Sequence, residues 1–226
     1  GAIAAVLEKH PEAVLLCTPK CKEMLIDELH IAPERVRTVA EGEKVSLGDR
    51  TLEFFHMPWV HWPETMVTWL PEESTLFSCD FFGSHLATND LFVTDEARSR
   101  EAAKRYYAEL MMPFRLPIRG HLDRLSRLDI KLILPSHGPG YRRPGFILDA
   151  YREWTSEAVK NTVVLPYVSM HGSTKVMVDA LIDGLTARGV AVERFDLASA
   201  DLGRLAMALV DAATIVIGTP AVLVGP

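Results

Sequence analysis

The sequence lacks any cluster of basic residues. Its 24 Lys and Arg are scattered and are outnumbered by 30 Asp and Glu, which gives a formal net charge of −6. A nucleic-acid-binding protein needs a basic face to neutralise phosphates, and docking on an anionic membrane surface needs a polybasic segment. We therefore expect neither nucleic acid nor a membrane among its partners.

Long hydrophobic runs are also missing. The longest candidate, residues 206–218, is interrupted by Asp211 and is shorter than the ~20 residues of a spanning helix. The opening stretch, GAIAAVLEKH, has neither the charged leader nor the cleavage pattern of a secretory signal. There is no initiator Met, and the final VLVGP directly follows an apolar run, so we expect the chain to be the middle of a longer protein.

Cysteine is scarce, with only Cys17, Cys21 and Cys79 in 226 residues. An odd, low count is typical of a protein from a reducing cytoplasm and not of a disulfide framework. Cys17 and Cys21 are four positions apart around Pro19, and no second pair completes a zinc site. Two buried or half-buried thiols are therefore favoured over a metal or redox pair.

The first part of the chain alternates strands and helices. Strands are predicted at 13–17, 36–39, 44–47, 51–55, 75–78 and 130–134, and helices at 19–29, 96–110, 120–128 and 147–160. The loop HMPWVHWPETM, residues 56–66, is expected to be irregular because it contains Pro58 and Pro63.

The pattern changes after residue 161. Strands at 162–168, 190–195 and 213–218 alternate with helices at 175–188 and 202–209, which predicts the opening of a doubly wound parallel sheet. We therefore expect an α/β protein with two domains, residues 1–157 and 161–226.

Three loops of the first domain carry residues of metal-ligand type just after a predicted strand: His61, Asp80 and His137. Residues at the ends of consecutive strands can converge although they are far apart in sequence. Two imidazoles and a carboxylate suit iron, zinc or manganese. Taken one at a time, each also has a simpler interpretation, since a loop histidine is commonly a surface residue and Asp80 could cap the turn at Gly83.

The second domain carries a small-residue turn between a strand and a helix, formed by Ser169, Met170, His171, Gly172, Ser173 and Thr174. Hydroxyls and backbone N–H groups at a helix N-terminus can bind a phosphate monoester. The third strand ends at the same sheet edge, in Thr219, Pro220 and Ala221. A capped turn in an ordinary α/β domain is the alternative interpretation of the hexapeptide.

Longer strings around these residues resemble the flavodiiron proteins, also called A-type flavoproteins. They are HMPWVHWPETMVTWL, LFSCDFFGSH and LILPSHGPGYR in the first domain, and SMHGSTKVM and GTPAVLVGP in the second. The resemblance implies the C-terminal part of a metallo-β-lactamase-like αββα sandwich with two non-haem irons, followed by the first half of a flavodoxin-like FMN domain. His61 and His137 would each bind one iron, and Asp80 would bridge them. His56, His85 and His121 match no ligand position and are treated as structural.

In the second domain the resemblance assigns residues 169–174 to the FMN phosphate and Thr219, Pro220 and Ala221 to the isoalloxazine ring. It implies an oxidoreductase that reduces dioxygen to water or nitric oxide to nitrous oxide. The electron donor would be a rubredoxin or a flavin reductase, and the protein a cytoplasmic, head-to-tail homodimer.

One departure from the family limits this expectation. Flavodiiron proteins take their remaining ligands from an H-x-E-x-D-H motif, which this sequence lacks. Three ligands cannot close the coordination of two irons, so we expect this chain alone to bind iron weakly and to be inactive. A metal hydrolase and a flavodoxin-type electron carrier are the alternative functions.

Overall fold

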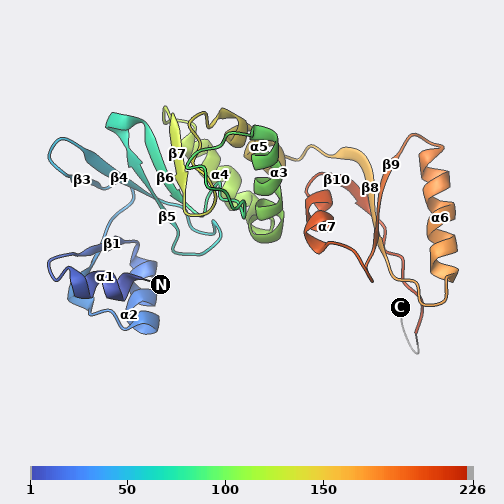
Figure 1. Cartoon of the computed structure of the whole chain (residues 1–226), viewed down its shortest axis with the longest axis horizontal. Coiled ribbons are helices and arrows are strands. Elements are labelled where there is room, and N and C mark those ends of the chain that lie inside the picture. The colour runs from blue at the N-terminus through green and yellow to red at the C-terminus, as the bar shows by residue number, and fades with distance from the viewer. Residues whose placement is uncertain (1, 223–226) are drawn as a thin grey trace. The chain divides into compact units, whose positions relative to one another are not determined.

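The computed structural model describes residues 2–222 and divides the chain into two compact units (Figure 1). The first unit comprises the chain up to Ala103 together with Pro113–Arg152, and the second comprises Lys104–Met112 together with the chain from Glu153 onward. Within the described residues no helix is both long enough and apolar enough to cross a bilayer.

The first unit begins with a small α/β layer. Helices α1 (Ile3–Lys9) and α2 (Pro19–Leu29) accompany the parallel strands β1 (Leu15–Cys17) and β2 (Val36–Thr38), and a short 3₁₀ turn, Pro33–Arg35, precedes β2. Thr18 begins α2, since its side chain accepts a hydrogen bond from the Cys21 N–H and Pro19 occupies the first turn. The apolar side chains of this layer form one core, built from Leu7, Cys17, Leu25, Ile31 and Val36.

A five-stranded sheet follows, in the order β3-β4-β5-β6-β7. Its strands are β3 (Lys44–Ser46), β4 (Thr51–His56), β5 (Met66–Leu70), β6 (Thr75–Cys79) and β7 (Leu132–Pro135). The pairs are antiparallel except β6 with β7, which is parallel. A parallel pair needs a crossover, and here it contains α3 (Glu96–Tyr106), a π turn (Tyr107–Met111), a 3₁₀ turn (Met112–Phe114) and α4 (Arg115–Leu125).

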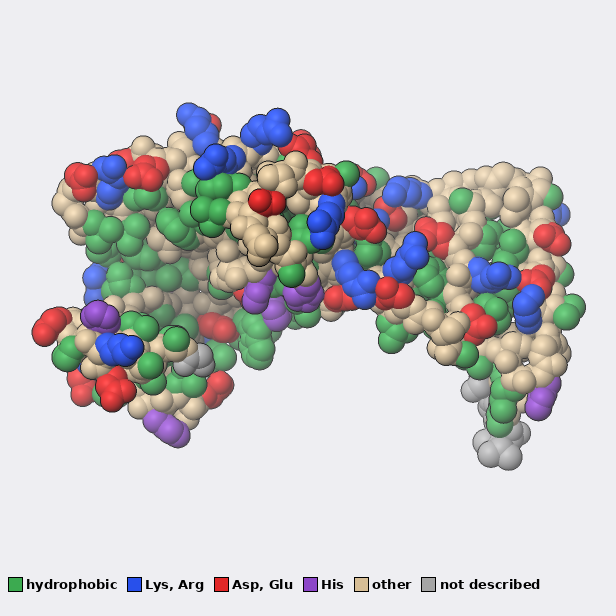
Figure 2. Space-filling model, viewed as in Figure 1, with side chains coloured by type: hydrophobic (Ala, Val, Ile, Leu, Met, Phe, Trp, Pro, Cys, Tyr) green, Lys and Arg blue, Asp and Glu red, His purple; other side chains and the backbone are tan. Residues whose placement is uncertain are grey.

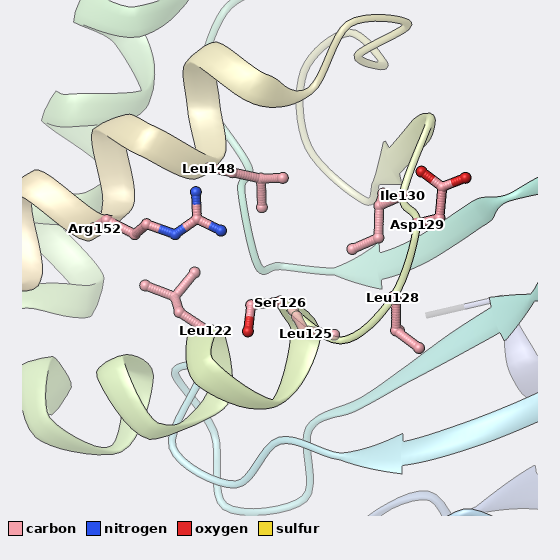
Figure 3. A pocket seen from close by; sticks show the side chains of 8 residues that line it. All are labelled: Leu122, Leu125, Ser126, Leu128, Asp129, Ile130, Leu148 and Arg152. Atoms are coloured by element: carbon pink, nitrogen blue, oxygen red, sulfur yellow. The ribbon is translucent and has the colours of Figure 1, made fainter.

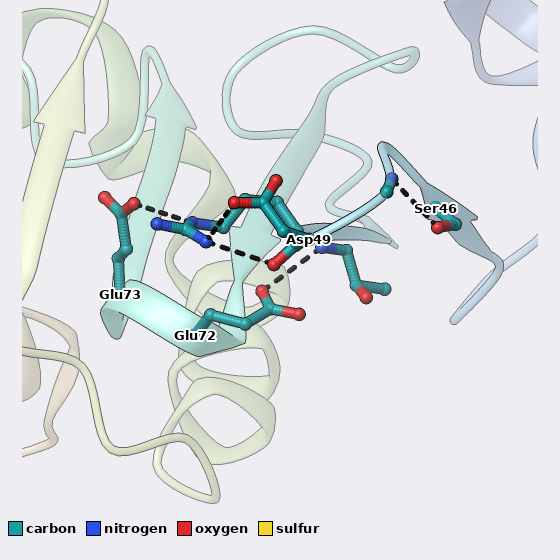
Figure 4. A network of polar contacts seen from close by, with 7 residues as sticks. Ser46, Asp49, Glu72 and Glu73 are labelled. Atoms are coloured by element: carbon teal, nitrogen blue, oxygen red, sulfur yellow. Dashed lines mark hydrogen bonds and ion pairs between the residues drawn. The ribbon is translucent and has the colours of Figure 1, made fainter.

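Arg50 ties the β3–β4 turn to the 3₁₀ turn Pro71–Glu73. Its guanidinium contacts Asp49 at 2.9 Å and Glu73 at 2.9 Å, while the Thr51 N–H donates to Glu72 (Figure 4). These side chains are largely exposed, so solvent screens the pairs and they add little to stability.

An open pocket of about 160 Å³ lies beside helix α4 and helix α5 (Gly145–Thr155), lined by Leu122 and Leu125 of α4, by Leu148 and Arg152 of α5, and by the loop of residues 126–130 (Figure 3). None of the residues predicted as site residues lines it.

The second unit contains a parallel sheet in the order β10-β8-β9, with β8 (Lys160–Tyr167), β9 (Ala191–Asp196) and β10 (Ala212–Ile215). Helices α6 (Ser173–Thr186) and α7 (Leu202–Leu209) connect these strands. Central β8 carries the core residues Leu165 and Tyr167. This is the strand order of a flavodoxin-like doubly wound fold.

Two ion pairs join the residues before the π turn to the rest of the second unit. Arg105 contacts Asp201 at 2.8 Å, and Asp201 also caps α7. Lys104 contacts Asp211 at 3.2 Å, and Lys160 contacts the same carboxylate at 2.6 Å.

One strand was not predicted, and one end of each of two helices was predicted wrongly. Strand β5, Met66–Leu70, was not predicted, although its buried Val67 and Trp69 alternate with less buried residues. Helix α4 begins at Arg115 and not at residue 120, because Pro117 is tolerated in a first helical turn. Helix α5 ends at Thr155 and not at residue 160, since Lys160 already begins β8.

Candidate functional site

His61 and His137 lie on either side of the Asp80 carboxylate. His61 Nε2 is 3.5 Å from Asp80 Oδ2, and His137 Nε2 is 3.3 Å from Asp80 Oδ1. The side chains of His61 and Asp80 are 22% and 19% exposed, whereas that of His137 is 52% exposed. Three side chains from three separate loops therefore meet in one place, and Figure 2 shows a group of histidines at the surface.

The turn after β6 presents Asp80. The buried Ser78 hydroxyl donates to the Phe81 carbonyl at 2.7 Å, and the Gly83 N–H donates to the Asp80 carbonyl at 3.1 Å. Phe81 and Phe82 stack with their ring centroids 4.0 Å apart, and the Tyr141 hydroxyl donates to the Phe82 carbonyl at 2.7 Å. A buried aromatic layer thus fixes the backbone from which the carboxylate projects.

The loop after β7 presents His137 beside this turn. The Ser136 N–H donates to the Cys79 carbonyl at 2.7 Å, and the Ser84 N–H donates to the His137 carbonyl at 3.1 Å. Gly138 has a φ of +81°, and a Cβ there would lie 2.2 Å from Ser84 Oγ. Only glycine fits a backbone that turns this sharply against its neighbour.

Positive φ values occur at three non-glycine residues around the site: Trp59 at 69°, Cys79 at 51° and Phe82 at 65°. Such conformations cost about 1–3 kcal/mol each, and they concentrate at functional sites. Here they flank His61 and Asp80. Burial, with a further contribution from the Asp80 charge, raises the pKa of the Cys79 thiol, so this neighbour of Asp80 stays protonated at neutral pH.

The donor set fits iron in type. Each imidazole lies near a different oxygen of one carboxylate, so a metal bound to each oxygen would have one imidazole beside it. In number the set falls short, because each of two metals would receive one imidazole and one carboxylate oxygen. Among residues 2–222 no three His, Cys, Asp or Glu side chains surround a single point as a complete metal site does.

Three other histidines of this unit, His56, His85 and His121, have different positions. The His85 ring lies 6.5 Å from the His137 ring, centroid to centroid and edge-on. His56 Nε2 is 3.0 Å from the Val39 carbonyl oxygen, and His121 Nε2 is 2.9 Å from that of Pro58. The sequence predicts a structural role for all three. His121 contacts the backbone of the loop that carries His61, which no local pattern in the sequence indicates.

In the second unit the predicted phosphate loop joins β8 to α6. Gly172, with a φ of 85°, directly precedes the helix, and the Lys175 N–H donates to Ser169 Oγ at 3.3 Å. Thr174 is buried, whereas Ser169 is half-buried and the remaining members of the hexapeptide are exposed. Small, accessible residues thus surround the N-terminus of a 14-residue helix.

The loop after β10 runs beside the start of this phosphate loop. Gly218 bridges to Tyr167 in parallel, and the Val168 N–H donates to the Gly218 carbonyl at 2.9 Å. A Cβ on Gly218 would lie 2.9 Å from that of Tyr167, so glycine permits this approach. Thr219, Pro220 and Ala221 follow directly after this contact, at the edge of the sheet where the switch point of such a fold lies. The last four residues of the predicted flavin-loop string, 223–226, lie outside the described residues.

Comparison with known proteins agrees with this architecture. The family model "ODP family beta lactamase" matches residues 1–138. The nitric oxide reductase of Moorella thermoacetica is 37% identical over 98% of this chain and 57% of its own length. The type A flavoprotein fprA of Rhodobacter capsulatus is 35% identical over 98% of this chain and 53% of its own length.

Solved structures show the same fold. The rubredoxin oxygen:oxidoreductase of Desulfovibrio gigas superposes with a TM-score of 0.90 and 25% identity, over 96% of this chain and 56% of that one. A flavo di-iron protein of Thermotoga maritima superposes with a TM-score of 0.86 and 26% identity, over 96% and 56%. The chain spans about half the length of the relatives that it matches. It belongs to the flavodiiron, or A-type flavoprotein, family, with an ODP-family beta-lactamase domain over residues 1–138.

Proposed function

We propose that the whole protein is an FMN- and di-iron-dependent oxidoreductase that reduces dioxygen to water, nitric oxide to nitrous oxide, or both. The observation that supports this most directly is the pair of contacts at Asp80, where His61 approaches one carboxylate oxygen and His137 the other. Relatives of this chain carry the names nitric oxide reductase and coenzyme F420H(2) oxidase.

In this proposal Asp80, His61 and His137 would together hold the two metals, with the carboxylate shared between them and one imidazole on each. The irons would supply electron transfer to a small oxidant, a reaction that amino-acid side chains alone do not perform. The chain's own residues provide ligation and orientation: the turn at residues 78–83 fixes the carboxylate, and Ser84 and Ser136 fix the loop of His137.

The remaining iron ligands would come from an H-x-E-x-D-H motif elsewhere in the whole protein, as the family resemblance implies. Residues 169–174 would hold the FMN phosphate at the N-terminus of α6, where N–H groups and the helix dipole favour an anion. Thr219, Pro220 and Ala221 would border the isoalloxazine ring. The electron donor would be a rubredoxin or a flavin reductase, the assembly a head-to-tail homodimer, and the compartment the cytoplasm, where free thiols persist.

Cofactor content and turnover of the whole protein test the proposal. We expect flavin absorbance, about two irons per chain, and consumption of oxygen or nitric oxide with reduced rubredoxin. Asp80→Asn should lose both iron and turnover, whereas Asp90→Asn, a matched change in an exposed loop, should keep both. Zinc without flavin would instead indicate a hydrolase, and flavin without metal an electron carrier; either result overturns the proposal.

A further inference from the structure

The loop that carries His61 leaves the sheet at His56 and rejoins it at Met66, so its carbonyls have no strand partner over most of this span. Two of those carbonyls, at the start of the loop, are met by side chains of α4. Arg124 Nη1 donates to the His56 carbonyl at 2.9 Å, and His121 Nε2 lies 2.9 Å from the Pro58 carbonyl oxygen.

The two α4 side chains also contact each other, and one of them contacts Glu41. Arg124 Nη1 lies 3.3 Å from His121 Nδ1, and Arg124 Nη2 pairs with Glu41 Oε1. The other oxygen of Glu41 accepts from the His56 N–H at 2.7 Å. Glu41, Arg124 and His121 therefore form one connected network along the backbone from His56 to Pro58.

This network fixes the tautomer of His121. A carbonyl oxygen can only accept, so Nε2 must carry the hydrogen that bonds to Pro58. Arg124 can only donate, so Nδ1 must present its lone pair. His121 is therefore neutral in the intact network, with its hydrogen on Nε2.

We propose that His121 and Arg124 are positioning residues for His61: by holding the carbonyls of His56 and Pro58 they set the path of the loop that aims the His61 imidazole at Asp80. The inference goes beyond the proposed function, because it concerns how the loop is held whether or not metal is bound. His61 lies three residues after the held Pro58. Thr65 closes the far end of the loop, because its hydroxyl donates to the Val60 and Trp62 carbonyls at 2.9 and 3.0 Å. The beginning of the loop, whose carbonyls are met by α4, is therefore the end that depends on that helix.

The network is also sensitive to pH. His121 is 8% exposed, and burial, together with the Arg124 charge, lowers its pKa below the ordinary value although the Pro58 hydrogen bond opposes this. The charged groups that act on it are Arg124 on its own helix and Glu41, with which Arg124 pairs. A second proton on Nδ1 would remove the acceptor of Arg124 and place two cations together. Acidification should therefore loosen the start of the loop.

Hydrogen exchange of the chain by NMR tests this. The amides of Met57, Trp59 and Thr65 make hydrogen bonds within the loop region and report its opening. His121→Leu should lower the protection factors of Met57 and Trp59 by about tenfold at pH 7, because it leaves the Pro58 carbonyl without its donor. His121→Gln keeps an N–H donor near the Nε2 position. The protection factors of Met57 and Trp59 in this variant should therefore stay within about threefold of those in the unsubstituted chain.

The pH dependence separates positioning from simple packing. From pH 7.5 to 5, protection in the original chain should fall toward that of the leucine variant, whereas the glutamine variant, which does not titrate, should stay flat. His10→Gln, at an exposed histidine outside the network, should behave as the original chain does. The inference is overturned if His121→Leu leaves protection unchanged. It is also overturned if the glutamine variant loses protection with pH as the original does, a comparison that stands even if the leucine variant fails to fold.

Discussion

Replacing Thr65 with valine should destabilise the first unit by about 2 kcal/mol. The side chain is 7% exposed, and its single hydroxyl hydrogen is shared between the Val60 carbonyl at 2.9 Å and the Trp62 carbonyl at 3.0 Å. Valine has nearly the same shape, so packing is preserved while the donor is lost. One net hydrogen bond contributes about 1 kcal/mol, and leaving a buried carbonyl unpaired raises the cost to about 1–3 kcal/mol.

Urea denaturation followed by tryptophan fluorescence measures this cost. With an m-value of about 2 kcal/mol/M, the midpoint should fall by about 1 M. Thr68→Val is the matched control, since it makes the same chemical change three residues along, where the described structure gives the hydroxyl no hydrogen bond. It should shift stability by less than about 0.5 kcal/mol. Equal effects of the two substitutions would refute the assigned role of the Thr65 hydroxyl.

Two further substitutions test other parts of the structure. Ion pairs with Lys160 and Lys104 outweigh the effect of burial and hold the pKa of Asp211 below its ordinary value of 3.8, so Asp211→Asn should lower the free energy of unfolding at pH 7. A carboxylate with a lowered pKa loses its contribution to stability as the pH falls through that pKa. The difference in free energy of unfolding between Asp211→Asn and the unsubstituted chain should therefore shrink below about pH 4. A difference that stays constant in acid melts would contradict this. Gly138→Ala should cost more than Gly42→Ala in thermal melts, since both glycines have positive φ values but only the first would place a Cβ 2.2 Å from Ser84 Oγ; equal costs would show that the Ser84 contact is unimportant.

The sequence predicted the candidate metal residues because each follows a strand. Apolar strings ending at Cys79 and Pro135 are short and buried, and Asp80 and His137 come within two residues of those ends. Strand ends of one sheet meet at one edge, so convergence could be expected without coordinates. The same logic applied to the second unit, where the strand order β10-β8-β9 brings the loops after β8 and β10 together.

What supports these residues could not be predicted in the same way. His121 and Arg124 lie more than 60 positions from the carbonyls that they hold, and nothing in a helix sequence shows which backbone atoms it will meet. Strand β5 was hidden by the proline-rich loop before it, although Val67 and Trp69 supply its buried face. Local patterns identify elements and their ends, whereas side-chain contacts to backbone depend on packing across the sheet.

The central proposal is that His61, Asp80 and His137 supply part of the ligand set of a two-metal site. The direct test is a titration of the chain with Fe²⁺ or Mn²⁺ under anaerobic conditions, followed by the imidazole signals of its eight histidines in NMR spectra. We expect weak binding in which the His61 and His137 signals broaden together, with both effects lost in Asp80→Asn. Broadening of only one of the two signals, or equal broadening of the exposed His10 and His30, would contradict the account.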